Sequence, residues 1–181
     1  MGKKNLPANI WKESKYSLYR RRIQNGVNIW HIHGEVSKDN TLMLGHEHYS
    51  GALQKMRSYL TRKKNFSPFV RGDINFDKNG AKYSWTDVFL RDDIYIVGFS
   101  LDYTEIDIWW LLSYKERQNL NSNNKVGETY FYHFYENSID ARSEAKLSLL
   151  ESFGVSVKRI EILQGYEKEY DKVLAEISLQ K

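Results

Sequence analysis

The second half of the chain has the most regular alternation of apolar and polar positions. The apolar run DIYIVGFS at residues 93–100 is typical of a strand buried in a parallel sheet. The segments TYFYHFYEN (129–137) and VSVKRIEIL (155–163) predict two further strands. Helical spacing of apolar residues predicts three helices, at 105–118, 138–154 and 166–179. Strands that alternate with helices in this order predict an open α/β sheet whose strands are mainly parallel.

The first half is less regular, and its apolar pattern predicts short strands followed by one helix. VNIWHIHGEV (27–36) alternates, which predicts a strand with His31 and His33 on one face. Asn25-Gly26 before it is a strong hairpin signal. TLMLGHEHY (41–49) predicts a second short strand, and residues 50–64 have the apolar spacing of a helix.

Two short motifs predict where helices begin. SWTD at 84–87 and TEID at 104–107 both place a hydroxyl residue three positions before an acid. This is the spacing of a capping box, in which the hydroxyl and the acid each bond a free backbone N–H of the first turn.

Together these segments predict an α/β fold with one open sheet of about four to five strands flanked by helices. We expect residues 1–26 to form a basic N-terminal segment and residues 27–181 to form one α/β domain. A chain of 181 residues is long enough to bury a sizeable core.

Composition narrows the classes of protein that remain. Apolar residues make up 41% and charged residues 28%, which is normal for a globular protein. No apolar run approaches the ~20 residues that a membrane span needs, and the first residues lack the apolar stretch of a signal peptide. The absence of cysteine excludes thiolate zinc sites and cysteine nucleophiles, and it favours a cytoplasmic location.

Four of the five histidines form two His-x-His pairs, His31 with His33 and His46 with His48. Facing pairs of imidazoles would suit a metal ion, with Glu35 or Glu47 as a further ligand. The double-stranded barrel that binds metal through His-x-His is all-β, however, whereas the second half of this chain predicts α/β. We therefore favour ordinary strand and loop histidines and predict no metal site.

Strand ends in the second half offer the clearest place for a ligand. In an open α/β sheet, ligands bind beyond the carboxyl ends of the strands. Gly98 and Ser100 directly follow the predicted strand at 93–97, where a glycine allows close approach of a ligand and a hydroxyl suits phosphate or ribose. Asn137 follows the next strand, where it would either reach a ribose hydroxyl or cap the following helix.

The order of these pieces resembles the sirtuin-like family. A strand ending in His33-Gly34, a strand ending in GFS (98–100) and a strand followed by Asn137 occur in the order in which that family places its NAD-binding motifs. The wider patterns IWHIHGEV…LMLGHEHYSGAL and IVGFSLDYTEIDIWWLL look closest to its bacterial anti-phage branch, including the abortive-infection AbiH group. The similarity covers residues 27 to about 137.

The resemblance implies NAD as substrate or ligand and assigns roles to five residues. His33 would be the catalytic residue, acting as base on a ribose hydroxyl or positioning the attacking water. Gly34, Gly98, Ser100 and Asn137 would bind the cofactor. The implied activity is NAD hydrolysis in an anti-phage defence module. His31 is expected to be a core or second-layer neighbour, His133 to be structural, and His46 and His48 receive no role.

One departure from the family pattern changes the expected activity. The family also uses a Gly-rich turn after its first strand to hold the pyrophosphate, and this sequence contains no Gly-x-Gly. Before His33 the only glycines are Gly2 and Gly26. We therefore predict a Rossmann-like half domain that is inactive alone and that works with a missing N-terminal half or a neighbouring gene product.

Two alternatives to an NAD-cleaving module remain open. The first is a non-catalytic nucleotide-sensing or protein-interaction module, which the missing Gly-rich turn favours. The second is nucleic-acid binding through Arg20-Arg21-Arg22, Arg62-Lys63-Lys64 and the thirteen tyrosines. The net charge is only +4, so we interpret those basic runs as solvated surface and do not expect nucleic acid as a partner.

Overall fold

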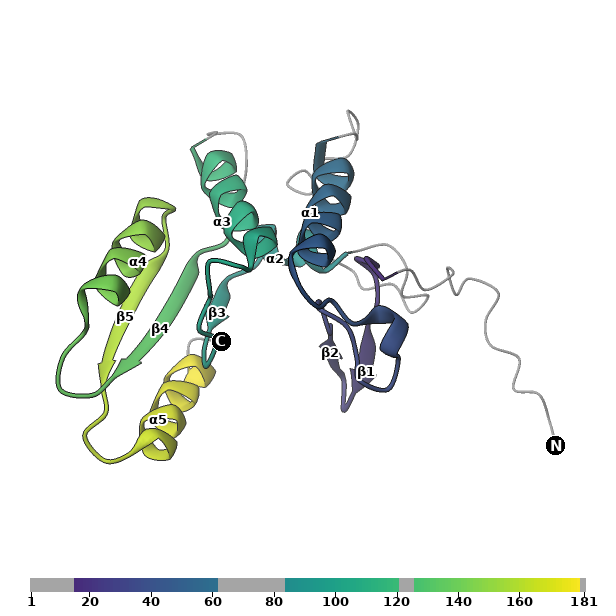
Figure 1. Cartoon of the computed structure of the whole chain (residues 1–181). Helices are drawn as coiled ribbons and strands as arrows, with labels where there is room; N and C mark the ends of the chain where they lie inside the picture. The colour runs from purple at the N-terminus through teal and green to yellow at the C-terminus, as the bar shows by residue number, and fades with distance from the viewer. Residues whose placement is uncertain (1–14, 62–83, 121–125, 180–181) are drawn as a thin grey trace. The chain divides into compact units, whose positions relative to one another are not determined.

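The structure is a computed structural model that describes residues 15–61, 84–120 and 126–179 (Figure 1). The chain divides into two compact units, which we describe separately. Of the described residues, the first unit contains 15–61, 84–88 and 104–107, and the second contains 89–103, 108–120 and 126–179. Residues 1–14, the predicted loop at 65–80 and the basic run Arg62-Lys63-Lys64 lie outside the described residues.

The second unit is built on a parallel sheet, as its sequence pattern predicts. Its three strands are β3 (Ile94–Ile96), β4 (Thr129–Tyr135) and β5 (Ser156–Glu161), in the spatial order β3-β4-β5. Ile96 pairs with Phe131, and the register of β4 with β5 continues to Tyr135 and Glu161. β4 therefore extends beyond the last residue of β3, which leaves the carboxyl end of β4 without β3 beside it.

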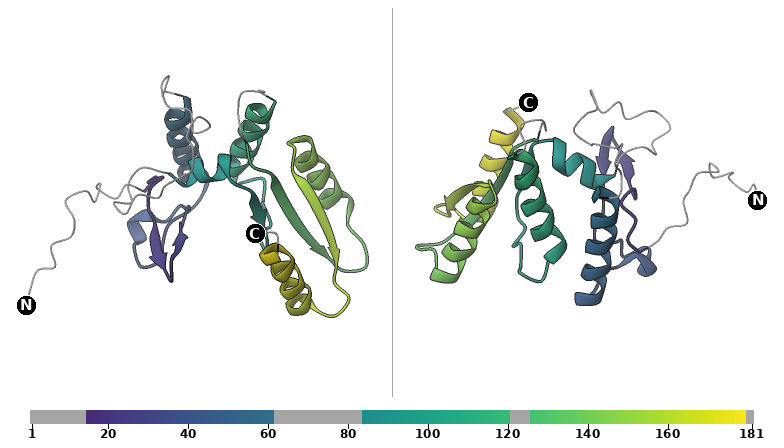
Figure 2. Two further views of the ribbon diagram at one scale, coloured as in Figure 1. Left: turned by 180° about the vertical axis from the view of Figure 1, so that it is seen from behind. Right: turned by 90° about the horizontal axis from the view of Figure 1, so that it is seen from above.

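Helices lie on both faces of this sheet. The connections contain α3 (Ile106–Asn119) and α4 (Ala141–Ser152), and α5 (Tyr166–Leu179) follows β5. Successive side chains of β4 point to opposite faces. Lys146 of α4 lies over the Phe131 ring, whereas Tyr170 of α5 stacks on Phe134 with the ring centroids 4.2 Å apart. α4 and α5 thus cover opposite faces, with the strands between them (Figure 2, right).

The core of the second unit comes from the apolar residues of these layers. Leu147 and Leu150 of α4 are fully buried, as are two leucines of α3 and Phe131 of β4. Burial of each such side chain contributes roughly 1.5–3 kcal/mol relative to exposure. The α/β class predicted from sequence is confirmed. The sequence predicts one sheet of four to five strands. In the described residues the strands form two sheets instead: three make the parallel sheet, and two make a separate antiparallel pair.

That pair belongs to the first unit. β1 (Arg22–Gln24) runs antiparallel to β2 (Val27–Ile29), and Asn25 and Gly26 form the turn between them. Both turn residues have positive φ, 50° and 78°, as a two-residue type I′ turn requires. The predicted hairpin is confirmed.

Beyond β2, the first unit differs from the strands that its sequence predicts. The strand expected at 27–36 ends at Ile29, and the segment 41–49 contains no strand. Instead, a 3₁₀ turn covers Asp39–Thr41 (η1) and α1 runs from His46 to Thr61. Gly45, with φ of 83°, precedes the helix, and the Leu44 N–H donates to Nδ1 of His48 at 2.7 Å. The imidazole therefore satisfies a backbone donor at the helix start, and the alternating pattern of 41–49 is not a strand signal.

The two predicted capping boxes have different outcomes. Before α2 (Trp85–Arg91), the Ser84 N–H donates to Asp87 Oδ2 at 2.9 Å and the Asp87 N–H donates to Ser84 Oγ at 3.2 Å, so this box is confirmed. α3 begins only at Ile106, and the side chain of Asp107 bonds His33 instead. Among the described residues, no helix has both the length and the apolar character to cross a membrane.

Candidate functional site

In the first unit, His33 is paired with a buried carboxylate. Nε2 of His33 lies 3.1 Å from Oδ2 of Asp107, which is the second residue of α3. The His33 side chain is 22% exposed and the Asp107 side chain 1%. The rings of Tyr49 and His33 also pack in a T-shaped arrangement, with centroids 4.9 Å apart. The histidine selected from sequence therefore has a carboxylate partner 74 positions away in the chain.

The loop around His33 depends on a glycine. Gly34 has φ of 102°, and a Cβ at this position would lie 2.4 Å from the carbonyl oxygen of Thr41. The Met43 N–H donates to the His33 carbonyl at 2.9 Å, which ties the two arms of the loop together. Gly34 is thus required for close backbone packing beside His33. Its predicted cofactor-binding role stays a prediction.

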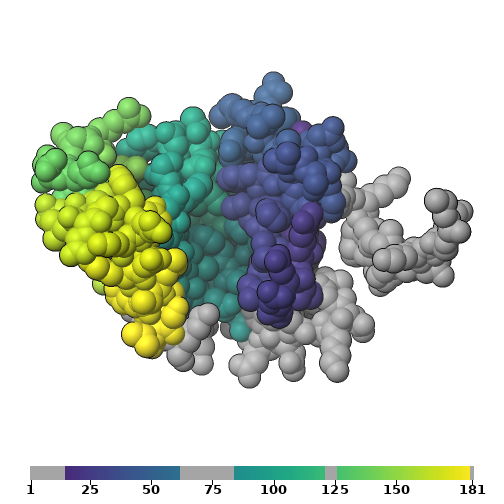
Figure 3. Space-filling view, turned by 90° about the horizontal axis from the view of Figure 1, so that it is seen from below, coloured from purple at the N-terminus to yellow at the C-terminus, as the bar shows by residue number. Residues whose placement is uncertain are grey.

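In the second unit, a cavity of about 260 Å³ lies at the carboxyl ends of β3 and β4. Figure 3 shows the molecule from the side on which these strands end, with α5 in yellow. The residues that line the cavity come from the segment after β3, from β4 and from α4 and α5. They are Gly98, Phe99, Ser100, Phe131, Tyr132, His133, Phe134, Lys146, Tyr166 and Tyr170.

The segment after β3 is held in a specific conformation. Gly98 has φ of 67°, and Leu101, a fully buried residue, has φ of 49°. The ammonium group of Lys146 donates to the Ser100 carbonyl at 2.7 Å. A Cβ on Gly98 would lie 3.1 Å from the Tyr170 hydroxyl, so the glycine allows the segment to pass close to α5. Positive φ at a buried leucine is uncommon and costs free energy, which the surrounding contacts offset.

Positive charge gathers beside this cavity. Burial, and then the charge of Lys146, lower the pKa of His133 from its ordinary value, so this imidazole is held in its neutral form. A second cavity of about 200 Å³ shares Ser100 and Lys146 with the first and is also lined by Arg142 and Tyr103. The guanidinium of Arg142 lies over the Tyr103 ring. A cation, a neutral imidazole and several aromatic rings can bind an anionic, ring-containing ligand.

The predicted site residues therefore fall in both units. His33 and Gly34 belong to the first unit, and Gly98, Ser100 and Asn137 belong to the second. Gly98 and Ser100 line the strand-end cavity, whereas Asn137 does not. Asn137 is exposed with φ of 60°.

The cap of α4 is not the residue that the sequence suggested. Asp140 is the N-cap, and its carboxylate accepts the N–H groups of Arg142 and Ser143 at 2.9 and 3.0 Å. The helix-capping interpretation of Asn137 is therefore wrong. Its predicted contact with a ribose hydroxyl stays a prediction.

The other histidines of the first unit have local roles. His31 is exposed. His46 is the first residue of α1 and lies 3.3 Å from the Ser50 hydroxyl, and Nε2 of His48 lies 3.3 Å from the Lys15 ammonium group. In the described part of the chain, no group of three or more His, Asp or Glu side chains is placed to hold a metal ion.

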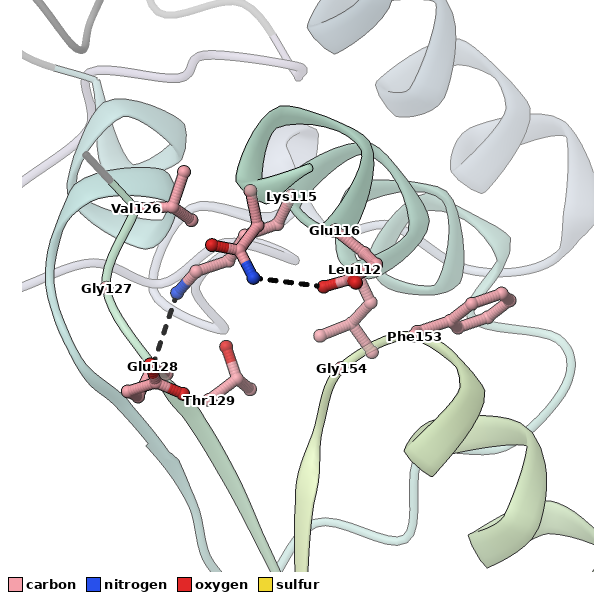
Figure 4. A pocket seen from close by; sticks show the side chains of 10 residues that line it. Leu112, Lys115, Glu116, Val126, Gly127, Glu128, Thr129, Phe153 and Gly154 are labelled. Carbon is pink, nitrogen blue, oxygen red and sulfur yellow. Dashed lines mark hydrogen bonds between the residues drawn. The ribbon is translucent and has the colours of Figure 1, made fainter. Parts of the chain in front are cut away.

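A third, much smaller pocket lies at the opposite end of the sheet, where β4 and β5 begin (Figure 4). Its volume is about 20 Å³, enough for one water molecule. Lys115 reaches it from α3, is 4% exposed, and donates to the carbonyls of Asp92 and Glu128 at 3.2 and 3.4 Å. Burial lowers the pKa of Lys115 to about 8. The pocket is too small for a substrate, so Lys115 serves to hold the starts of β3 and β4 together.

Sequence reasoning missed the polar partners of both sites. Asp107 has the spacing of a capping box, which predicts a role at a helix start and no contact with His33. Lys146 is one of four charged residues of α4, and Tyr170 is one of two tyrosines of α5, so no local pattern distinguishes either residue. His133 was assigned a structural role, although it lines the strand-end cavity. The signal available was its position near the carboxyl end of a predicted parallel strand, where ligands bind.

The basic run in the first unit is only partly solvated surface, because Arg20 is buried whereas the Arg22 side chain is exposed. Arg20 is 7% exposed and donates to the Lys15 carbonyl, and Arg22 forms an ion pair with Glu35, which is itself buried. These arginines stabilise the fold around β1.

Compared with protein-family models, curated proteins and solved structures, the chain has no match.

Proposed function

We propose that the chain is a sirtuin-like nucleotide-binding protein that takes NAD, or a related nucleotide, at the strand-end cavity of its second unit. The observation that supports this proposal is the cavity itself. It lies where ligands bind in open α/β sheets, and it is lined by Gly98 and Ser100, both of which the sequence predicts as site residues.

The lining of the cavity suits the adenosine end of such a ligand. Lys146 supplies positive charge for a phosphate, and Tyr166 and Phe99 offer ring surface for a base. At about 260 Å³ the cavity is at the lower limit of small-molecule sites, which commonly measure ~300–1,000 Å³. This volume suits part of a dinucleotide better than a whole one, consistent with a half site that binds weakly.

The hydrolytic part of the proposal rests on His33. NAD cleavage develops an oxocarbenium-like ribose cation, and a base can activate a ribose hydroxyl or water for attack. The pairing of His33 with Asp107 supports acid–base chemistry at this residue. By resemblance, we propose that hydrolysis takes place in an anti-phage defence assembly that also supplies a Gly-rich pyrophosphate turn. The isolated chain is proposed to release no nicotinamide.

A second candidate function is a non-catalytic nucleotide sensor or protein-interaction module. The absence of Gly-x-Gly from the sequence favours it, because backbone N–H groups of a Gly-rich turn are the usual ligands of a pyrophosphate. In this alternative the cavity binds a nucleotide and His33 has no chemical role.

The test of nucleotide binding is titration of the isotope-labelled chain with ADP-ribose and NAD, followed by NMR. We expect a dissociation constant near ~1 mM, equivalent to about −4 kcal/mol. Shifts should be concentrated at Gly98, Ser100 and His133. Lys146→Gln should weaken binding about tenfold, whereas the exposed control Lys168→Gln should not. Absence of shifts at these residues, or equal effects of both variants, would exclude the cavity as the site.

Nicotinamide release separates the two candidate functions. The isolated chain should release none above background. An assembly that contains the complementing half should release it, and His33→Ala should remove most of that activity. Equal turnover with and without the imidazole would leave the sensor as the better description.

A further inference from the structure

The carboxylate beside His33 is buried to an extent that requires an explanation. Asp107 is 1% exposed, and Oδ1 has no hydrogen-bond partner among the described residues. Among the described residues, the His33 side chain hydrogen-bonds the Asp107 carboxylate, with Nε2 3.1 Å from Oδ2. Burying a carboxylate is costly, and its position in the first turn of α3 offsets only part of that cost. Asp87, equally buried, bonds backbone and hydroxyl groups at the start of α2, whereas the Asp107 carboxylate is directed at the imidazole of His33.

The contact determines which ring nitrogen of His33 carries the proton. A carboxylate can only accept hydrogen bonds, so Nε2 must be the donor in this pair. In the neutral ring, Nδ1 is then the unprotonated, basic nitrogen. In the described part of the chain, Nδ1 forms no hydrogen bond, and it is not buried. The His33 side chain is 22% exposed, so Nδ1 faces solvent.

Two further contacts restrict the orientation of the imidazole. Tyr49 meets the His33 ring edge-on at an interplanar angle of 78°, and burial raises the pKa of the Tyr49 phenol, which keeps it neutral. The His33 carbonyl accepts the Met43 N–H, which holds the backbone of the residue. The ring is thus held on one side by Asp107, on another by Tyr49 and at its base by the loop.

We infer that Asp107 is a positioning residue that holds His33 in the Nε2–H tautomer, so that Nδ1 acts as the general base. Nδ1 takes the proton of a hydroxyl group or water, the ring becomes an imidazolium, and the Asp107 carboxylate stabilises that charge without taking the proton. Nδ1 then returns the proton to solvent or to a leaving group. The inference rests on the proposed function only for the identity of the reaction.

The first test needs no ligand and uses the whole chain. ¹⁵N NMR of the imidazoles at a pH where they are neutral should show His33 almost entirely in the Nε2–H tautomer. Asp107→Asn, which keeps the shape of the side chain, should change this distribution, whereas the exposed control Asp171→Asn should leave it unchanged. Circular dichroism of each variant verifies the fold. A His33 tautomer distribution that Asp107→Asn does not alter would overturn the inference.

The second test measures the basicity of Nδ1 by its reactivity. Mass spectrometry should show that diethyl pyrocarbonate modifies His33 several-fold more slowly in Asp107→Asn than in the wild type. The modification rate of His31 serves as internal control and should not change. A merely structural hydrogen bond would leave the reactivity of His33 unaffected or increase it by exposing the ring, and either result would contradict the inference.

The third test connects the pair to turnover and keeps the two proposals distinguishable. In an NAD-cleaving assembly, Asp107→Asn should lower kcat by roughly 10²-fold with KM little changed, because the base would be misprotonated rather than absent. If the tautomer and reactivity results hold but no assembly cleaves NAD, the pairing stands and the proposed reaction fails. If cleavage depends on His33 but not on Asp107, the inference fails and the proposed function stands.

Discussion

The two units of this protein differ in the mix of residues that they bury. The second unit has three parallel strands, helices on both faces and a core of leucine and phenylalanine side chains. The first unit has a three-residue hairpin and long irregular segments, and several of its buried residues are polar: Arg20, Glu35, Thr41, Ser84, Thr86, Asp87 and Asp107. The second unit is organised mainly by apolar layers, whereas the first unit buries many hydrogen-bonded polar side chains beside apolar ones such as Leu18 and Met56.

This difference extends to the candidate sites. The strand-end cavity follows from the fold of the second unit, since any open parallel sheet places loops at the carboxyl ends of its strands. The His33–Asp107 pair does not follow from a common fold, because it joins two residues distant in sequence. A site created by architecture tolerates changes of side chain, whereas a site created by one pair of residues does not.

Core truncation should give the largest effects and should act in the unit where it is made. Met56→Ala in α1 and Leu150→Ala in α4 each remove a fully buried side chain, and each should lower the free energy of unfolding by about 2–5 kcal/mol. Hydrogen exchange should show the loss first in α1 for the former and in α4 and β5 for the latter. Leu149→Ala, at a residue 39% exposed, is the control and should cost less than 1 kcal/mol, roughly. Equal losses of protection throughout the chain for both variants would contradict the comparison.

Glycine substitutions in the first unit should separate backbone strain from steric clash. Gly26 and Gly34 both have positive φ, but a Cβ on Gly26 meets nothing within 4 Å, whereas one on Gly34 would overlap the Thr41 carbonyl. Gly26→Ala should therefore cost about 1–2 kcal/mol from the left-handed conformation alone. Gly34→Ala should cost clearly more, because the loop that carries His33 must move. Urea denaturation of the two variants measures the difference, and equal midpoints would show that the loop adapts freely.

The helix caps offer a smaller comparison between a buried and an exposed site. Ser84→Ala should destabilise by about 1–2 kcal/mol, since Ser84 is fully buried and also bonds Thr86. Asp140→Ala in the second unit should destabilise less, because that cap is exposed. Hydrogen bonds from Ser143 lower the pKa of Asp140 in the folded chain. The stability that the ionised Asp140 cap contributes is therefore present above the ordinary carboxyl pKa and is lost as the pH falls through the folded-state pKa. Thermal unfolding at neutral and acidic pH tests both points, and a loss for Asp140→Ala that is independent of pH would contradict the second.

The last expected effect is a rise in stability at mildly alkaline pH. The pKa of Lys115 is about 8 in the folded chain against 10.5 normally, so between these values the unfolded chain binds more protons and stability rises with pH. Burial raises the pKa of Tyr59 and Tyr114, so stability should fall above pH ~10, where tyrosines of the unfolded chain ionise first. Lys115→Met should abolish the rise but not the fall, as denaturation between pH 7 and 11 would show. Tyr59→Phe is the control that should keep the rise.

Much of the second unit was determined by local sequence. The alternation in TYFYHFY, the apolar run before Gly98 and the helical spacing of 166–179 each predict an element that the structure contains. Gly98 and Ser100 could be selected as site residues because their place after a strand is a property of sequence order. Periodicity is reliable here because each element buries one face against a regular layer.

Only the tertiary structure decided the organisation around His33. Alternation at 27–36 and 41–49 predicted strands, but a strand needs a hydrogen-bonding partner, and the partner of β2 is only three residues long. Backbone groups that lack a ladder are satisfied instead by side chains such as Thr41 and His48. The pairing of His33 with Asp107 depends on bringing the segment that carries Asp107 to the loop within the first unit, and no local pattern encodes a contact across 74 positions. Local sequence determined which segments could form elements, and long-range polar contacts decided what the histidine-rich segment became.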